Sequence, residues 1–282
     1  MKIDIQSFAE RERNLEERKK WGDYWVQQHL ESAFLSQGVE IGAGDCLLYL
    51  YGLPMPIRPA RKKIVWIYSH PDRCDFEFIR QFDEVYCLSQ PFISELAKHD
   101  IQAKYLIGAT NRNGSKLPQA HDIVFVGNSR GNVGRAIIND LYRSHKDKPL
   151  PYKVEIWGWG WDNHEWYAGP YYPNESLHEL YGSSAISLND HHGDMSRWGF
   201  VAVKIFDILA SWGFCISDTN AGISGIFGAS VPQYQGQNGL RSLVDFYMEN
   251  PEQREGKTRA GKLIARGEQW EHRAEEFVEA FQ

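Results

Sequence analysis

This chain of 282 residues has few cysteines and no long apolar run. The four cysteines (Cys46, Cys74, Cys87 and Cys215) lack CxxC spacing and lie mostly in apolar stretches, which is typical of buried thiols in a reducing compartment. No apolar segment is long enough to span a bilayer, and the first residues do not resemble a signal peptide. We therefore expect a cytoplasmic protein without a transmembrane segment.

The chain also lacks an excess of basic residues. It has 31 lysines and arginines against 37 acidic residues, and no basic tail or patch stands out. This balance argues against binding to a nucleic-acid backbone. The GxGxxG spacing is absent, and no acidic residue suited to a ribose follows the first strand, which argues against a NAD-dependent oxidoreductase.

What the chain does contain is an alternation of apolar strands and helices. Residues 1 to about 110 include the strand-like runs KIDIQSF, GDCLLYLYGL and KKIVWIY, separated by segments of helical character. The polar stretch NRNGSKLPQA reads as a linker, and the same alternation restarts at HDIVFVG. Alternating β and α units predict an α/β protein with parallel sheets in Rossmann-like domains.

The most informative stretch runs from Ser187 to Asp218 and reads SLNDHHGDMSRWGFVAVKIFDILASWGFCISD. A buried strand ends in a polar cluster, and Gly199-Phe200 opens an apolar run with helical spacing that stops near Gly213. A second buried strand then ends at Asp218. This pattern is the unit of a parallel sheet, whose ligands bind beyond the carboxyl ends of the strands.

Four residues of this stretch are candidates for nucleotide binding. A glycine at a helix start lets the backbone approach a ligand, so Gly199 and Phe200 could contact a phosphate. Lys204 and Asp207 lie three residues apart and share a helix face. They could hold a phosphate and a pair of ribose hydroxyls, although an ordinary surface ion pair explains the spacing equally well.

A second candidate loop follows the strand HDIVFV. Gly127, Asn128, Ser129 and Arg130 occupy this loop. Its backbone amides and the arginine could hold a diphosphate. Because any turn between a strand and a helix can carry glycine, the loop is a weak signal by itself.

Two titratable residues stand out in the first half. His70 follows the strand KKIVWIY and precedes a proline, so it could act as a general base or simply hydrogen-bond the turn. Asp23 lies at the start of a helix that ends at Gly38, where an N-cap role accounts for it without any chemistry.

The motifs LNDHHGDM, GF and KIFDILASWGFCISD resemble the C-terminal signature of bacterial glycosyltransferases of the GT-B superfold. The most similar group is the spore-maturation-protein-like (CgeB-like) family with a glycosyl transferases group 1 C-terminal domain; FVGNSR, an early WGD and SHPD also fit it. The chain departs from the family at Lys204, where arginine is usual, and at Trp212, where glycine is usual. The lysine loses a bidentate fork, and we expect the tryptophan ring near the donor site.

The resemblance implies a GT-B fold, with two Rossmann-like domains facing a cleft. Residues 1–115 would bind the acceptor, residues 116–264 the nucleotide sugar, and a helix over 265–282 would cross back onto the first domain through Trp270, Phe277 and Phe281. The enzyme would transfer a sugar from a nucleotide-activated donor without a metal or other cofactor. The acceptor stays open: a glycan, a lipid-linked glycan, a protein or a nucleic-acid base.

The resemblance also assigns roles. The two loops would contact the diphosphate, Lys204 would neutralise charge on the leaving group, and Asp207 would accept from the ribose hydroxyls. His70 or Asp23 would be the base if transfer is inverting, whereas Tyr172 and Asn174 would lie near the nucleobase. The predicted donor residues are Gly127, Asn128, Ser129, Arg130, Tyr172, Asn174, Asp190, His191, Asp194, Gly199, Phe200, Lys204 and Asp207.

Two further functions are compatible with the same fold, because fold does not fix function. A catalytically inactive nucleotide-sugar-binding protein would bind the donor without turnover. A sugar-nucleotide epimerase would form its product with no acceptor present.

Overall fold

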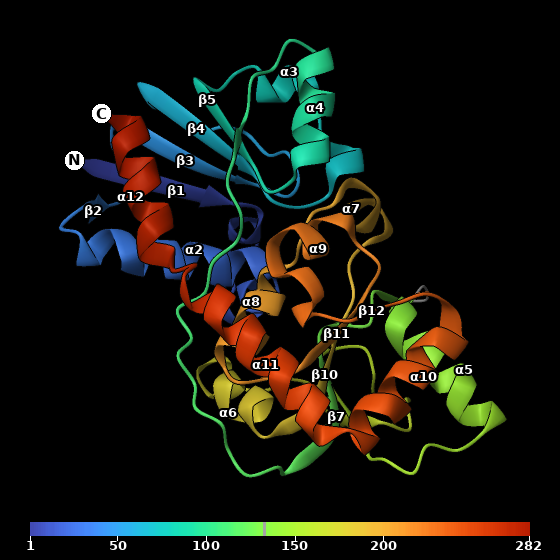
Figure 1. The fold of residues 1–282 in the computed structure, drawn as a ribbon. Coiled ribbons are helices and arrows are strands. Elements are labelled where there is room, and N and C mark those ends of the chain that lie inside the picture. Colours follow the sequence, from blue (N-terminus) through green and yellow to red (C-terminus); the bar gives the residue numbers. More distant parts are fainter. Residues whose placement is uncertain (132–133) are drawn as a thin grey trace. The chain divides into compact units, whose positions relative to one another are not determined.

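The computed structural model describes residues 1–131 and 134–282 (Figure 1). These residues form two compact units, each built on a six-stranded sheet in which every described strand pair is parallel. The predicted α/β class is confirmed. Unit 1 comprises Met1–Asn111, His192–Val201 and Glu268–Gln282, and unit 2 comprises Arg112–His191 and Ala202–Gly267.

The sheet of unit 1 has the strand order β2-β1-β3-β4-β5-β6. The order reverses between β1 and β3, so a ligand crevice is expected at the carboxyl ends of these two strands. β3 is buried along its whole length, as its apolar run predicts. The strands are β1 (Lys2–Ser7), β2 (Glu40–Ile41), β3 (Cys46–Tyr51), β4 (Lys62–Ile67), β5 (Glu84–Cys87) and β6 (Lys104–Tyr105).

The last helix, α12, belongs to unit 1 and packs on α2. Trp270, Phe277 and Phe281 are buried, and the rings of Trp270 and Phe277 lie 6.2 and 5.8 Å from that of Trp66. The predicted return of the chain to the first domain is confirmed. The helices of unit 1 are η1 (Phe8–Arg11), α1 (Leu15–Arg18), α2 (Gly22–Ser36), η2 (Pro71–Arg73), α3 (Phe76–Ile79), α4 (Gln90–Lys98), α7 (Gly193–Trp198) and α12 (Trp270–Phe281).

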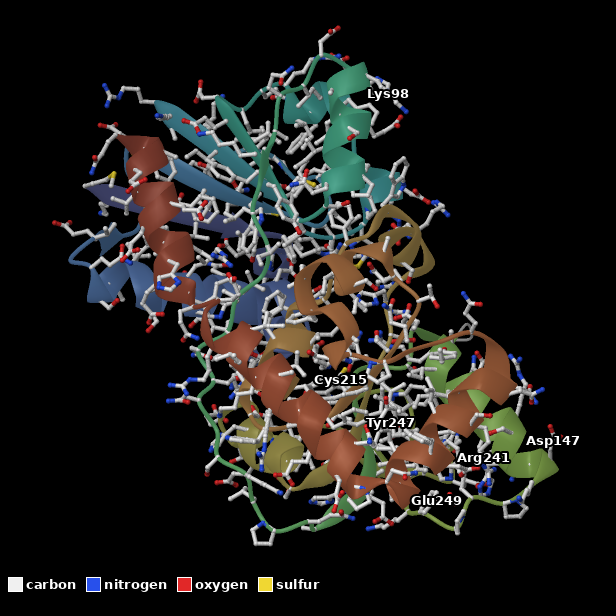
Figure 2. All side chains as sticks on the ribbon, in the orientation of Figure 1. Lys98, Asp147, Cys215, Arg241, Tyr247 and Glu249 are labelled. Carbon is white, nitrogen blue, oxygen red and sulfur yellow. The ribbon has the colours of Figure 1, made fainter. Side chains whose placement is uncertain are left out.

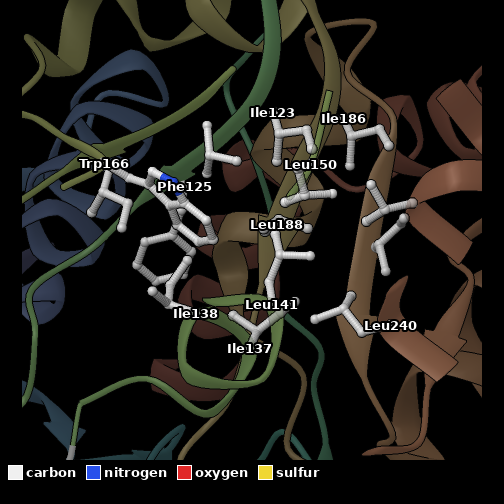
Figure 3. Packing of buried hydrophobic residues seen from close by; sticks show 14 of the residues in the cluster. Ile123, Phe125, Ile137, Ile138, Leu141, Leu150, Trp166, Ile186, Leu188 and Leu240 are labelled. Carbon is white, nitrogen blue, oxygen red and sulfur yellow. The ribbon is translucent and has the colours of Figure 1, made fainter. Parts of the chain in front are cut away.

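The sheet of unit 2 has the order β12-β11-β10-β7-β8-β9, which reverses between β7 and β10. Alternate residues of β7, such as Ile123 and Phe125, pack with Ile137 and Leu141 in one apolar core (Figure 3). Cys215 is buried in this unit and, like the other three cysteines, is a free thiol (Figure 2). The strands are β7 (His121–Val126), β8 (Val154–Trp157), β9 (Tyr167–Gly169), β10 (Ser184–Asn189), β11 (Cys215–Asp218) and β12 (Gln233–Tyr234).

Helices cover both faces of this second sheet. In Figure 1, α5 and α10 lie together on one side, and α6, α8 and α11 lie together on the other. Within the described residues, no helix has both the length and the hydropathy needed to cross a membrane. The helices are α5 (Ala136–Asp147), η4 (Asn174–Ser176), α6 (Leu177–Gly182), α8 (Val203–Ala210), α9 (Ala221–Phe227), η5 (Gly228–Ser230), α10 (Gly236–Glu249) and α11 (Pro251–Arg266).

The helix predicted to open at Gly199 begins only at Val203, and a separate short helix, α7, ends just before Gly199. Gly199 is the C-cap of α7 with φ 74°, a left-handed conformation that glycine adopts without strain, and α8 begins only at Val203. Gly199 and Phe200 therefore follow the end of a helix and do not begin one. The segment 192–201, which the sequence places in the C-terminal domain, groups with unit 1.

Trp212 lies away from the edge of the sheet that carries the candidate site. It lines a cavity of about 210 Å³ with Ser184, Ala185 and Phe214, which lie at the amino ends of β10 and β11. Its backbone has φ 63°, which explains why a glycine suits this position. Trp212 therefore lies at the opposite edge of the sheet from Asp190 and Asp218, which lie at the carboxyl ends of β10 and β11.

Candidate functional site

The loops after β7 and β10 meet where the strand order of unit 2 reverses. The buried Asp190 carboxylate lies 2.9 Å from Nη1 of Arg135 and 3.8 Å from Nη1 of Arg130. Arg135 also donates to the Asn128 carbonyl at 2.8 Å, and Arg130 donates to the His191 carbonyl at 2.9 Å. Two guanidinium groups and one carboxylate therefore tie the two loops together.

Lys204, in the first turn of α8, lies beside the same loops. Its Nζ donates to the Val126 carbonyl at the end of β7 at 3.0 Å and lies 4.6 Å from the centre of the Phe125 ring. Burial lowers the pKa of Lys204 to about 7; Arg135 adds to this effect, and Asp190 opposes it. Lys204 is therefore a half-buried group packed against the end of β7 and not half of a surface ion pair.

Three cationic side chains meet at this point. Arg130, Arg135 and Lys204 gather around the carboxylate of Asp190, and the neighbouring Asp218 carboxylate faces His191. Guanidinium and ammonium groups are the usual protein partners of phosphate, and the carboxyl edge at a reversal of strand order is where open α/β sheets bind ligands. The arrangement suits a dianionic or trianionic group such as a diphosphate.

The glycine loop itself is held by the Trp-Gly series after β8. The amides of Gly127 and Ser129 donate to the carbonyls of Trp157 and Trp159 at 2.8 and 3.0 Å. Gly158 permits this approach, because a Cβ there would lie 2.3 Å from the Gly127 carbonyl oxygen. These two amides are engaged within the protein, so the expectation that they hold a diphosphate does not fit this structure.

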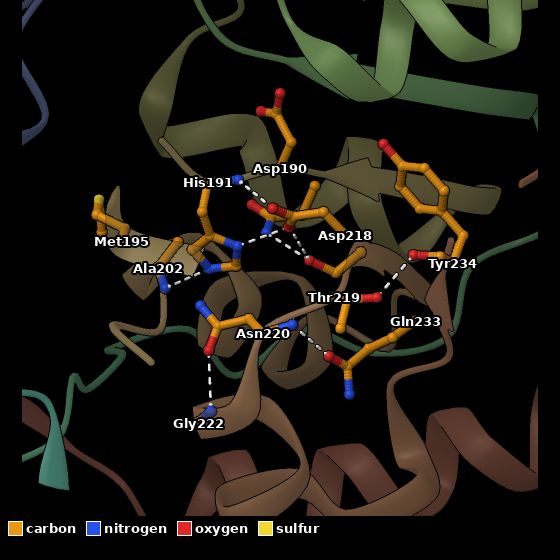
Figure 4. Close-up of polar contacts among 12 residues, drawn as sticks. Asp190, His191, Met195, Ala202, Asp218, Thr219, Asn220, Gly222, Gln233 and Tyr234 are labelled. Atoms are coloured by element: carbon orange, nitrogen blue, oxygen red, sulfur yellow. Dashed lines mark hydrogen bonds and ion pairs between the residues drawn. The ribbon is translucent and has the colours of Figure 1, made fainter. Parts of the chain in front are cut away.

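His191 has both ring nitrogens engaged (Figure 4). Nδ1 lies 2.7 Å from the Asp218 carboxylate, and Nε2 accepts from the Ala202 amide at 3.0 Å. A nitrogen that accepts carries no proton, so the ring is the neutral Nδ1–H form. Its side chain is wholly buried. His191 therefore supports the start of α8 and does not present its ring to a sugar.

A third cluster connects Asp207 to Asn174. Arg112, buried in the predicted linker, donates from Nη2 to the Asn174 side-chain oxygen at 2.7 Å, and its Nε lies 3.8 Å from the Asp207 carboxylate. Tyr172 is half-buried and packs edge-on against Trp157, with ring centres 5.0 Å apart. The structure thus brings Asn174 and Asp207 onto one guanidinium group.

The candidate residues of unit 1 lie near the reversal of its own sheet. Asp23 is buried in the first turn of α2, where its Oδ2 accepts from the Ala9 amide at 3.1 Å, and burial raises its pKa. His70, after β4, has φ 53° and its Nδ1 lies 3.0 Å from Ser69 Oγ. Gly52, after β3, lies against Ser69.

The segment 192–201 packs on the loop after β4. Arg197 forms an ion pair with Asp72, the Trp198 indole donates to Asp72 at 3.0 Å, and the rings of His192 and His70 have centres 4.9 Å apart. Asp194, in the first turn of α7, accepts from the Met195 amide at 2.9 Å. Asp194, Gly199 and Phe200 therefore group with unit 1, and the other predicted donor residues group with unit 2.

Three residues of these clusters were not predicted as site residues. Arg135 follows a glycine directly before α5, a position that could have marked it as a phosphate ligand. Arg112 carried no signal, because its partners lie far along the chain. Asp218 ends a buried strand, which could have been noticed.

The sequence profile of a family described as glycosyl transferase-like matches residues 134–279, more than half of the chain. None of the curated protein sequences that were compared matches the chain. Within the described residues, no group of three or more His, Cys, Asp or Glu side chains is placed to hold a metal ion.

Solved structures show the same fold at low sequence identity. Sucrose-phosphate synthase from Thermosynechococcus elongatus has a TM-score of 0.71 at 10% identity, covering 99% of this chain and 98% of its own. A T4 phage β-glucosyltransferase, determined with UDP and Mn²⁺, has a TM-score of 0.64 at 11% identity, covering 100% and 98%. An α-glucosyltransferase, determined with UDP-glucose and DNA containing an abasic site, has 0.63 at 10% identity, covering 95% and 96%.

These structures confirm the predicted GT-B fold class, with its two Rossmann-like sheets. The family match covers the loop of Arg135, the loop of Asp190 and the whole of α8. The chain belongs to the glycosyl transferase-like family and is a glycosyltransferase.

Proposed function

We propose that the enzyme transfers a sugar from a nucleoside-diphosphate donor bound at the β7–β10 edge of unit 2. The observation that carries this proposal is the cluster of three cationic side chains, Arg130, Arg135 and Lys204, around Asp190. A diphosphate compensates this charge and keeps Lys204 protonated. In the transition state the same cations stabilise the charge that builds on the leaving diphosphate.

The nucleoside would extend from the diphosphate along α8. Asp207 lies three residues, just under one helical turn, beyond Lys204. It would accept from the ribose hydroxyls, with Asn174 and Tyr172 near the base. Asp190 would orient the two arginines. This assignment needs no metal ion, since three cationic side chains supply the charge.

The acceptor would bind to unit 1. Asp23 is the better-supported base, because a buried carboxyl with a raised pKa can take a proton nearer neutral pH than an exposed one. His70, whose ring lies close to that of His192, is the alternative base. The acceptor classes remain a glycan, a lipid-linked glycan, a protein or a nucleic-acid base, and membership of the spore-maturation-protein-like group remains a prediction.

A thermal-shift screen without metal tests the donor site. We expect one nucleoside diphosphate to stabilise the protein, by about 2.7 kcal/mol at a hundred times its Kd. Lys204→Met and Asp207→Ala should abolish the shift, and Lys116→Met, which changes an exposed lysine paired with Glu255, should keep it. A screen in which no nucleotide shifts the midpoint, or in which all three variants respond alike, would contradict the proposal.

Turnover assays distinguish the remaining functions. Release of the nucleoside diphosphate that depends on an added acceptor supports transfer. A sugar nucleotide converted without acceptor would indicate an epimerase, and binding with no release under any condition would indicate an inactive binding protein.

A further inference from the structure

Arg112 fixes the orientation of the Asn174 side-chain amide. A guanidinium group carries only donors, so the atom of Asn174 that faces Arg112 Nη2 at 2.7 Å must be the oxygen. Arg112 is buried, and its Nε lies 3.8 Å from the Asp207 carboxylate, so it cannot turn away without exposing two polar partners. The amide oxygen of Asn174 is therefore occupied within the protein.

What Asn174 can offer to a ligand is the amide NH₂ group. No hydrogen bond to this nitrogen is found within the described residues, and the side chain is half-exposed. Asn174 begins η4, in the connection that leaves the carboxyl end of β9, the same edge of the sheet that carries Asp190. The shared contact with Arg112 also places Asn174 close to Asp207.

We propose that Asn174 selects the nucleobase by donating to O4 of uracil or O6 of guanine, so that the enzyme takes uracil or guanine nucleotides in preference to cytosine or adenine nucleotides. This inference rests on the proposed function, which puts the ribose at Asp207 and the base beside Asn174. Uracil O4 and guanine O6 accept hydrogen bonds, whereas cytosine and adenine present an amino donor at the corresponding positions.

The selectivity follows from the fixed amide. A free asparagine rotates its amide and offers either a donor or an acceptor. Because Arg112 holds its oxygen, Asn174 would face the amino group of cytosine or adenine with its own NH₂ group. Two donors would then meet, and neither would have an acceptor. A site built to donate to one ring oxygen discriminates against the wrong base by about tenfold or more.

Isothermal titration with UDP, CDP, GDP and ADP tests the inference. Each keto nucleotide has an amino counterpart, so the ratio of the two Kd values isolates the contribution of the base. If the enzyme binds pyrimidine nucleotides, we expect UDP to bind at least about tenfold more tightly than CDP. If it binds purine nucleotides, we expect the same advantage of GDP over ADP. Equal affinities, or tighter binding of the amino nucleotide, would overturn the inference.

Two variants test the mechanism. Asn174→Asp keeps the shape and the contact with Arg112 but offers a carboxylate oxygen, so the keto-to-amino ratio should fall by at least about tenfold. Arg112→Met releases the amide, so the ratio should move towards one. If Asn174→Asp leaves the ratio unchanged, Asn174 does not select the base.

The same titrations distinguish a failure of the proposed donor site from a failure of the role of Asn174. Binding that Asp207→Ala weakens, without any preference between keto and amino bases, would leave the donor site standing and remove only the role of Asn174. The absence of binding by all four nucleotides would remove both.

Discussion

At the scale of single residues, Lys204 is a cationic group whose charged form is disfavoured by its surroundings when no anion is bound. Its ammonium group donates to the Val126 carbonyl at the end of β7, and two arginines lie nearby. Burial lowers its pKa to about 7 from an ordinary 10.5. An anionic ligand would reverse this penalty.

The first prediction concerns the stability of the ligand-free protein. The unfolded chain holds a proton on Lys204 up to pH 10.5, whereas the folded protein loses it above about pH 7. The contribution of Lys204 to the free energy of unfolding is therefore most unfavourable below pH 7 and improves as the pH rises to 10.5. Lys204→Met should stabilise the protein, most below pH 7, when denaturant unfolding is compared at several pH values. A difference that grows with rising pH would contradict this.

The second prediction concerns binding. A diphosphate requires the protonated form of Lys204, so its affinity should fall as the pH rises above 7, with uptake of a proton on binding. Titration calorimetry in buffers of different ionisation enthalpy measures this uptake. Lys204→Arg, which stays charged, should bind without it; an unchanged uptake in that variant would assign the proton to another group.

At the residue scale, the sequence indicates candidates where chemistry and motif coincide. Lys204 and Asp190 are recognisable from the stretch that contains them. Arg112 is not, because its partners Asn174 and Asp207 are 62 and 95 positions away (174 − 112 and 207 − 112), and only the folded chain brings them together. His191 was recognised, but its engaged ring nitrogens could not be foreseen.

At the scale of elements, the turn after β7 depends on the turn after β8. The amides of Gly127 and Ser129 donate to the carbonyls of Trp157 and Trp159, the residues on either side of Gly158. This contact needs a residue without Cβ and with positive φ at position 158, where φ is 152°. The Trp-Gly series therefore shapes the loop that carries Arg130.

The third prediction tests this dependence. Gly158→Ala should lower the free energy of unfolding by about 3 kcal/mol, from strain and overpacking, and should weaken nucleotide binding. Gly225→Ala is the matched control, because it lies in α9 with open space around it. The control should be neutral or slightly stabilising in denaturant unfolding, and equal losses in both variants would contradict the assignment.

Long elements were predictable from the sequence and short ones were not. β3, β4 and α2 have apolar patterns long enough to read. β2 and β9 have two and three residues, too few to show a period, and their neighbours in the sheet determine them. α7 was missed because its six residues begin with glycine and follow a polar cluster.

At the scale of the whole molecule, unit 1 is assembled from three separate segments of the chain. α12 supplies Trp270 and Phe277, which pack on Trp66 of β4. Part of the apolar core beside the sheet of unit 1 therefore comes from residues near position 282.

The fourth prediction measures that dependence. Phe277→Ala should lower the free energy of unfolding of unit 1 by about 3–5 kcal/mol, because it leaves a cavity beside Trp66. Phe246→Ala removes the same ring from a site that is 47% exposed and should change little. Tryptophan fluorescence during urea unfolding reports the loss; similar midpoints for the two variants would show that α12 contributes little.

The division of the chain also sets an order for folding during synthesis. The strands of unit 1 are synthesised before those of unit 2, but the core of unit 1 also needs residues 192–201 and 268–282. Unit 2 is complete once residue 267 has emerged, before α12 is available. Domains usually fold as they emerge, from the N-terminus onwards. The strands of unit 1 therefore lack part of their core until residues 268–282 have emerged.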